Sequence, residues 1–193
     1  KTLKKVRKAM NKTSMLSYLL YEDGKITIDE ISPKDRFGIM YKDYTQYTSA
    51  SVGKSLVSYV TGHAICKGYI NGVDHRLSDW PLLENTLFYD QKLINLLNMA
   101  TGHQKYADFD LKTDKYHKNA NSNTVEFHLK KGVFKNSKKA KSKYQYTNFL
   151  SNLLINYVWF KSEGKFQDLL DEIFVEKAKI EHDAWFLKMN DRT

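Results

Sequence analysis

The fold of this protein is decided by residues 48–70, TSASVGKSLVSYVTGHAICKGYI. From Ser51 to Lys67 the apolar residues recur at the spacing of one face of an α-helix. The members of this apolar row are Val52, Leu56, Val57, Val60, Ala64 and Ile65. Gly68 follows as a helix stop, because glycine readily takes the left-handed conformation that ends many helices. The segment therefore predicts a helix with little polar surface that runs through a core.

The flanking sequence predicts an N-terminal hairpin and a mainly helical lobe. Residues 13–32 hold two alternating apolar runs around Asp23-Gly24, which is a strong β-hairpin signal. Helical patterns dominate residues 51–178. The predicted helices cover residues 2–12, 51–67, 92–100 (begun by Asp90 as cap and stopped by Thr101-Gly102), 122–131 within a long loop, 147–161 and 165–178. Because a lone hairpin is a marginal sheet, we expect residues 1–193 to be one partial domain whose later strands are missing.

Composition fits a folded globular protein, and the histidine pattern does not predict a metal site. A chain of 193 residues that is 41% hydrophobic can bury a sizeable core. No stretch approaches the ~20 apolar residues of a membrane span. Cys66 is the only cysteine, and its apolar helical setting predicts a small core residue. The histidines lack the spacing of metal ligands.

Four other residues have structural interpretations. Asp79 and Trp80 are predicted to fix the turn after the long helix. Trp159, with Trp185, is predicted to line the core or a cleft.

The formal net charge of +9 comes largely from the first eight residues and from residues 130–143, KKGVFKNSKKAKSK. A basic segment can bind an anionic partner or simply form a solvated surface. The second segment contains little aromatic material that could stack on bases, so we expect a Lys-rich surface and no nucleic acid. A nucleic-acid-binding module stays as an alternative that steeply salt-dependent affinity would reveal.

Ser51-Val52-Gly53-Lys54 is an S-x-x-K motif at the start of the predicted helix. A serine hydroxyl is a weak nucleophile that needs a neighbouring base. Spacing of three residues on a helix places the Lys54 amine beside the Ser51 oxygen. The helix N-terminus offers backbone N–H groups to an oxyanion, and burial would favour the neutral amine of Lys54. A phosphate-binding loop is rejected, because Thr48 stands where that motif needs its first glycine.

Tyr146-Thr147-Asn148 is a second candidate, at the entry to the helix near 147–161. A tyrosine phenolate near a lysine can act as a general base, and an asparagine amide can hold a substrate carbonyl. A packing tyrosine with an asparagine helix cap would explain the same residues.

Taken together, these landmarks resemble the serine β-lactamase-like (penicillin-recognising) family, particularly its class C and esterase or amidase-like branch. Residues 48–70 are similar to the family's nucleophile helix, and LSDWPLL (77–83) to the connection after it. LINLLNMATGH (93–103) resembles the short helix with a Leu-Leu-x-x-x-(Ser/Thr)-Gly ending, although Met99 stands where the family has histidine. Residues 144–180 resemble the Tyr-x-Asn segment and its two following helices.

The resemblance implies an α/β (α+β) fold of the β-lactamase/transpeptidase type, with a helical lobe packed on an antiparallel sheet. It implies that Ser51 is acylated, that Lys54 relays its proton and that Tyr146 is general base and acid. Asn148 would orient the substrate, and the Ser51 N–H would form half of the oxyanion hole. No metal or cofactor is implied. A periplasmic or secreted location would fit the family, although no signal peptide is visible in the sequence.

The family's third motif, Lys-Thr-Gly or His-x-Gly on a late strand, is absent, since Gly164 is the only glycine after Tyr146. That strand supplies the other oxyanion donor, and losing one donor typically costs ~10²–10³ in rate. We therefore expect a fragment of a serine hydrolase for small amides or esters, nearly inactive alone. The alternative on the same fold is a non-catalytic binding protein.

Overall fold

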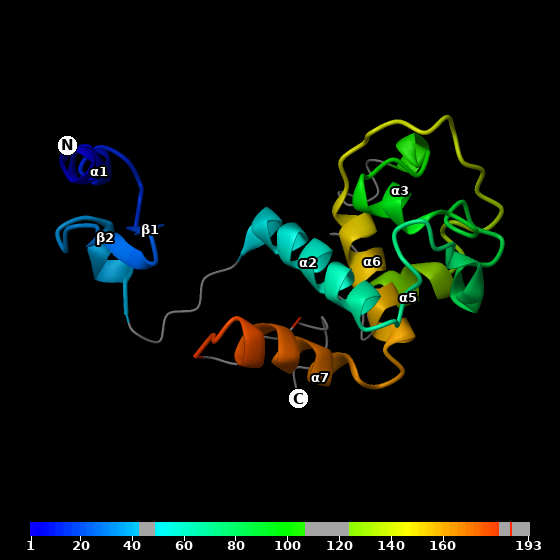
Figure 1. The fold of residues 1–193 in the computed structure, drawn as a ribbon. Helices are drawn as coiled ribbons and strands as arrows, with labels where there is room; N and C mark the ends of the chain where they lie inside the picture. Colours follow the sequence, from blue (N-terminus) through cyan, green and yellow to red (C-terminus); the bar gives the residue numbers. More distant parts are fainter. Residues whose placement is uncertain (43–48, 107–123, 182–185, 187–193) are drawn as a thin grey trace. The chain divides into compact units, whose positions relative to one another are not determined.

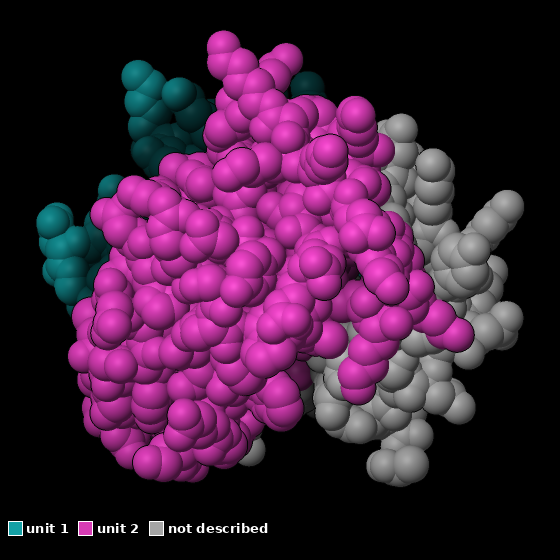
Figure 2. Space-filling model, turned by 90° about the vertical axis from the view of Figure 1, so that its right-hand side faces the viewer, with its two compact units in different colours: residues 1–49 teal, residues 50–193 magenta. Residues whose placement is uncertain are grey.

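The computed structural model describes residues 1–42, 49–106, 124–181 and 186, and it is a mixed α/β structure with a small antiparallel sheet. Contacts divide the chain into two compact units, residues 1–49 and residues 50–193, coloured separately in Figure 2. Each unit is described by itself.

The first unit is a helix beside a β-hairpin. Helix α1 spans Thr2–Met10, and strands β1 (Ser17–Glu22) and β2 (Lys25–Ile31) pair antiparallel. The hairpin prediction is confirmed: Asp23 and Gly24 both have positive φ, as a tight turn of this kind requires. The predicted helix over 2–12 is confirmed too.

A small apolar cluster stabilises the first unit. It contains the buried residues Val6, Met10 and Ile28, with Met15, Tyr18 and Leu20 packed against them. The Arg7 guanidinium donates two hydrogen bonds to the Glu30 carboxylate, at 3.0 and 2.9 Å, and so ties α1 to β2. A 3₁₀ turn, η1 (Phe37–Met40), follows the hairpin.

The second unit is helical (Figure 1). The 3₁₀ turn η2 (Ala50–Val52) runs directly into α2 (Gly53–Cys66). The remaining elements, in chain order, are the 3₁₀ turns η3 (Leu77–Asp79) and η4 (Pro81–Leu83), α3 (Leu93–Leu97), the 3₁₀ turn η5 (Gln104–Tyr106), α5 (Thr124–Lys130), α6 (Asn148–Lys161), α7 (Phe166–Leu170) and the π-helical turn η6 (Asp171–Lys177). Five helical segments predicted from the sequence are thereby confirmed, with shorter bounds in several cases, while residues 107–123 lie outside the described residues.

Helix α6 is the centre of the core. It packs against α2, α3 and α5, and Leu150, Leu153, Leu154, Tyr157 and Val158 along it are all buried. These residues form a broad apolar stripe along one side of α6, which is typical of a helix packed on a core. Glu163 and Gly164, both with positive φ, separate α6 from α7 as the sequence predicts.

Helix α2, by contrast, is buried on one face only, which corrects the sequence prediction. It packs against α6 and α7 through Val57, Val60 and Ala64, whereas Val52 is 70% exposed and Leu56 is 41% exposed. The open face bears a hollow of about 500 Å³ whose lining is Ser55, Ser58, Tyr59, Gly62, His63 and Cys66. Cys66 is thus exposed and is not the core residue that was predicted.

Three further predictions are wrong. Asp90 does not cap α3: Lys92 precedes the helix, and the Asp90 carboxylate instead accepts a 2.8 Å hydrogen bond from Arg76. The helix also ends at Leu97, before the predicted stop. Trp159 is 56% exposed and is therefore not a core residue, because it lies on the side of α6 opposite its buried residues. Trp185 lies outside the described residues. Among the described helices, none is long and apolar enough to cross a membrane.

Candidate active site

The start of α2 positions Ser51 and Lys54. Ser51 lies in the 3₁₀ turn η2, and Lys54 is in the first turn of α2, three residues later. Ala50, immediately before Ser51, has φ of 45°, a left-handed conformation that costs a residue with a side chain roughly 1–2 kcal/mol. Strained backbone of this kind clusters at functional sites, and the sequence offers no signal for it at an alanine.

The start of α6 positions Tyr146 and Asn148. Thr147 is the N-cap, and its side-chain oxygen accepts a hydrogen bond from the Phe149 N–H at 3.2 Å. A capping threonine satisfies one of the free N–H groups of the first turn. Tyr146 therefore immediately precedes the cap, and Asn148 is the first helical residue.

The four predicted site residues come together although 95 residues separate Ser51 from Tyr146. The Ser51 Oγ lies 2.7 Å from the Tyr146 hydroxyl oxygen, a hydrogen bond in which either hydroxyl can donate. The Lys54 Nζ donates to Ser51 Oγ at 3.4 Å and to Asn148 Oδ1 at 2.6 Å. The same Nζ lies 4.9 Å from the centre of the Tyr146 ring, within cation–π range. Sequence analysis predicted these four residues, and the structure joins them in one hydrogen-bonded group.

The group lies at the surface of the second unit. Ser51, Tyr146 and Asn148 are exposed, and Lys54 is half-buried. The burial that the sequence predicted for Lys54 is therefore only partial. An exposed serine oxygen beside a phenol and an amine is accessible to a substrate carbonyl without rearrangement of a covering segment among the described residues.

A buried histidine holds the backbone next to the site, a role that the sequence pattern did not predict. His103 is 2% exposed; its Nδ1 lies 2.8 Å from the Thr101 hydroxyl and its Nε2 lies 2.9 Å from the Gln145 carbonyl oxygen. The Gln145 N–H donates to the Met99 carbonyl at 2.9 Å. The backbone N–H and the backbone carbonyl of Gln145 are thus both hydrogen-bonded. These two bonds fix the position of the chain directly before Tyr146.

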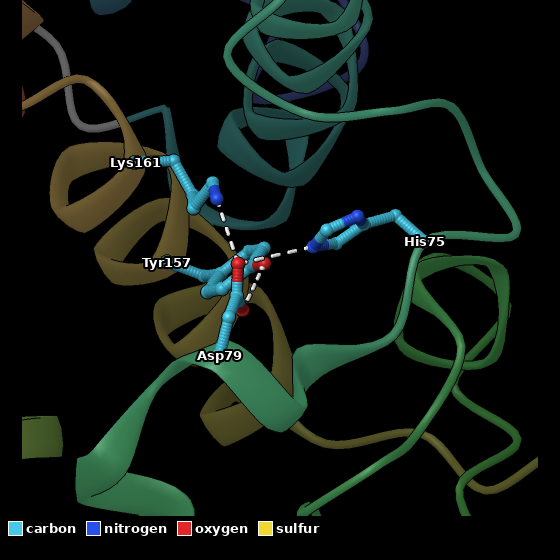
Figure 3. Close-up of polar contacts among 4 residues, drawn as sticks. All are labelled: His75, Asp79, Tyr157 and Lys161. Atoms are coloured by element: carbon cyan, nitrogen blue, oxygen red, sulfur yellow. Dashed lines mark hydrogen bonds and ion pairs between the residues drawn. The ribbon is translucent and has the colours of Figure 1, made fainter.

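The other end of α6 is held by a second polar cluster (Figure 3). The Asp79 carboxylate accepts hydrogen bonds from the Tyr157 hydroxyl and from Lys161 Nζ, each at 2.7 Å, and His75 Nε2 lies 3.2 Å away. Tyr157 is fully buried, and the neighbouring Trp80 ring lies 5.7 Å from its ring. The prediction that Asp79 and Trp80 fix the turn after α2 omitted the partner, which is α6.

Opposing effects act on the two central groups of this cluster. Burial works against the charge of Asp79, but the hydrogen bonds from Lys161 and Tyr157, with the nearby positive charges, outweigh it and lower the pKa of Asp79. Burial, together with the bond to Asp79, raises the pKa of Tyr157 well above its usual value. Asp79 is therefore a charged acceptor, and Tyr157 stays a neutral donor.

Groups of three or more His, Cys, Asp or Glu side chains that could hold a metal ion do not occur in the part of the chain that the structure describes. In comparisons with known proteins, no family model and no curated protein sequence matches the chain. The function is therefore inferred from the residues and their geometry.

Proposed function

We propose that this protein is a serine hydrolase that cleaves an amide or an ester through an acyl-enzyme on Ser51. The observation that carries the proposal is the 2.7 Å contact between Ser51 Oγ and the Tyr146 hydroxyl, with Lys54 Nζ bound to the same Ser51 oxygen. A nucleophile within hydrogen-bond reach of a base, with a third group that orients the pair, is the general signature of nucleophilic catalysis. The sequence resemblance to serine β-lactamase-like hydrolases supports the same roles.

In the acylation step, Ser51 Oγ bonds to the substrate carbonyl carbon while its proton passes to the Tyr146 oxygen. This role requires Tyr146 to begin the step as the phenolate, and the Lys54 amine lies 4.9 Å from the centre of its ring. The tetrahedral intermediate then collapses. The bond to the leaving amine or alcohol breaks, and Tyr146 gives the proton to that group.

Deacylation reverses these transfers with water as the nucleophile. Tyr146 takes a proton from the water as its oxygen bonds to the acyl carbon. The proton returns to Ser51 Oγ when the acyl–oxygen bond breaks, and the free carboxylic acid leaves. Asn148 holds Lys54 in place through its Oδ1 and, in this proposal, orients the substrate.

The proposal is tested by labelling the chain with a neutral fluorophosphonate, a probe that attaches covalently to activated serines. Intact-mass and peptide-mass measurements would locate the label on Ser51. Ser51→Ala should abolish labelling, while Ser55→Ala, which removes an exposed hydroxyl one turn further along α2, should leave it unchanged. Labelling that persists in Ser51→Ala would overturn the proposal.

Tyr146 has an equally close control. Tyr146→Phe should slow labelling about 100-fold or more, since a positioned general base contributes ~10²–10⁴ in rate. Tyr144→Phe changes an exposed tyrosine two residues earlier and should label at the wild-type rate. Equal rates for the two variants would remove Tyr146 as the base.

A further inference from the structure

We infer that the segment before Tyr146 selects a substrate carrying a negative charge, an inference that rests on the proposed hydrolase function. The residues responsible form what we name the lysine arm, Lys138, Lys139, Lys141 and Lys143. The arm belongs to the Lys-rich segment for which the sequence predicts only a solvated surface. Three observations on its charge, its anchoring and its place point to a substrate-binding role.

The first observation is the unbalanced charge. The sequence from residue 127 to residue 162 contains no aspartate or glutamate. All four lysines of the arm are exposed. None of their amines forms an ion pair with a carboxylate in the described part of the chain, whereas Lys161, Lys92 and Lys67 elsewhere do. The lysine arm therefore presents positive charges that can attract an anionic group of a substrate.

The second observation is that the arm is anchored through its backbone. The Ala140 N–H donates to the Gly102 carbonyl at 2.8 Å, and the Ser142 hydroxyl donates to the Ala100 carbonyl at 2.6 Å. The Gln104 side-chain amide donates to the carbonyls of residues 141 and 143, at 3.2 and 3.3 Å. These bonds use polar backbone groups and leave the lysine side chains exposed.

Gly102 shows how closely this segment is fitted. Its φ is 76°, and a Cβ built on it would collide with the carbonyl oxygen of Ala140. The backbone of the arm thus lies directly on residue 102, which only glycine permits. Beside this contact is an open hollow of about 510 Å³ whose lining is Gln104, Ala140, Lys141, Ser142 and Lys143.

The third observation is the distance to the site. A fully extended chain spans at most about 3.6 Å per residue, so the Cα of Lys143 lies within roughly 11 Å of the Cα of Tyr146, and that of Lys141 within roughly 18 Å. Figure 1 shows this part of the chain, in yellow, passing α3 before it enters α6. Charges are screened over about 8–10 Å at physiological salt. In this proposal Lys143 and Lys141, the two lysines of the arm nearest to Tyr146 along the chain, act on a bound substrate, and the more distant Lys138 and Lys139 contribute mainly at low salt.

The chemistry of the arm favours a small or peptide-like substrate with a carboxylate. Lysine is a flexible point charge that suits a single anionic group. Binding of single-stranded nucleic acid uses aromatic side chains on which bases stack, and residues 135–143 contain none. A carboxylate on the acyl part of the substrate, several bonds from the reacting carbonyl, would meet Lys143 and Lys141 while the carbonyl meets Ser51.

The test compares two activated esters that differ only in charge, mono-nitrophenyl adipate and its methyl ester, on the 193-residue chain. The burst of nitrophenolate gives the acylation rate at Ser51. We expect the acid to acylate faster than the methyl ester at about 20 mM salt, and the preference to fall at about 300 mM salt, where the screening length is shorter.

The variant that tests the arm is Lys141→Gln/Lys143→Gln. A unit charge at roughly 4–10 Å in water changes a rate by about 2- to 5-fold. The double variant should therefore slow acylation by the acid about 5- to 20-fold and leave the methyl ester within about 2-fold. Lys165→Gln is the matched control, because this exposed lysine lies beyond the far end of α6, about 20 Å along the helix from Asn148.

The outcomes separate the two proposals. If both esters and the fluorophosphonate react at Ser51 with no preference for the acid, the substrate inference is overturned and the hydrolase proposal stands. If none of the three reagents reacts at Ser51, both the hydrolase proposal and the substrate inference are overturned. If a single-stranded oligonucleotide binds with a steep salt dependence that the double variant abolishes, and the acid is not preferred, the arm is a nucleic-acid surface instead.

Discussion

The Lys54 amine donates a 2.6 Å hydrogen bond to Oδ1 of the Asn148 side chain and so joins the first turn of α2 to the first residue of α6. The contact is shorter than the 3.4 Å between the same amine and Ser51 Oγ. Asn148 therefore determines where the Lys54 amine lies, and through it the charge beside Tyr146. The site therefore forms only when the N-terminus of α2 lies next to the N-terminus of α6.

Asn148→Ala should release Lys54 and slow fluorophosphonate labelling of Ser51 by about 10- to 100-fold, since a small misplacement of a catalytic group can cost that much. Labelling rates followed by intact mass would measure the loss. Asn152→Ala, on an exposed position one turn further along α6, is the control and should label normally. An Asn148→Ala rate equal to that of Asn152→Ala would show that Lys54 needs no partner.

Removal of the Asp79 carboxylate charge should destabilise the second unit, because Tyr157 and Lys161 both donate to it. Hydrogen bonds to charged groups contribute about 1.5–3 kcal/mol each, so Asp79→Asn should lower the free energy of unfolding by roughly 2–4 kcal/mol. Urea unfolding followed by circular dichroism measures this. Asp74→Asn breaks an exposed ion pair with Lys92 and should cost about 1 kcal/mol or less. Equal losses in the two variants would contradict a special role for Asp79.

Glu172 gives a pH dependence of stability. Hydrogen bonds from Lys177 and Lys67 lower its pKa to about 2 in the folded protein, from an ordinary value of 4.5. The Glu172 carboxylate therefore contributes fully to the stability of the fold above its ordinary pKa of 4.5. This contribution is lost as the pH falls from 4.5 toward 2. The difference in urea midpoint between wild type and Glu172→Gln should be largest near neutral pH and shrink across that window.

The control for this pH experiment is Glu84→Gln, an exposed glutamate that forms no ion pair among the described residues. Its midpoint should follow that of the wild type at each pH. A Glu172→Gln difference that grows as the pH falls would have the wrong sign and would contradict the assignment.

Alanine substitutions at Gly102 and Gly68 distinguish the cost of a left-handed backbone conformation from the cost of a steric clash. Gly68 and Gly102 have nearly the same φ, 78° and 76°, but a Cβ at Gly68 meets open space while one at Gly102 meets the Ala140 backbone. Gly68→Ala should cost about 1 kcal/mol from the backbone conformation alone. Gly102→Ala should cost more, by roughly 1–3 kcal/mol, and should also slow labelling at Ser51. Equal losses of stability would mean that the lysine arm is not seated on Gly102.

Local signals made much of this fold predictable. The Asp23-Gly24 turn specified the hairpin, and the spacing of apolar residues specified α2 and α6, because each feature is encoded within a few neighbouring residues. The site motifs S-x-x-K and Tyr-x-Asn were visible for the same reason. Their meeting in space was expected only through a family resemblance.

What the sequence could not predict depends on long-range packing. The apolar pattern of α2 does not tell which of two faces meets α6, so the exposure of Leu56 and Cys66 was missed. The roles of His103 and Asp79 are set by partners 42 and 78 residues away. The positive φ of Ala50 has no local signal at all.

The central position of α6 also means that α2 is synthesised long before the helix against which it packs. The ribosome releases α2 well before α6, with 95 residues between Ser51 and Tyr146. At translation rates of about 5–20 residues per second, α2 waits roughly 5–20 seconds for the helix it packs against. During that time its apolar face has no native partner. We therefore expect the nascent chain to be a client of ribosome-associated chaperones until residue 161 has left the exit tunnel.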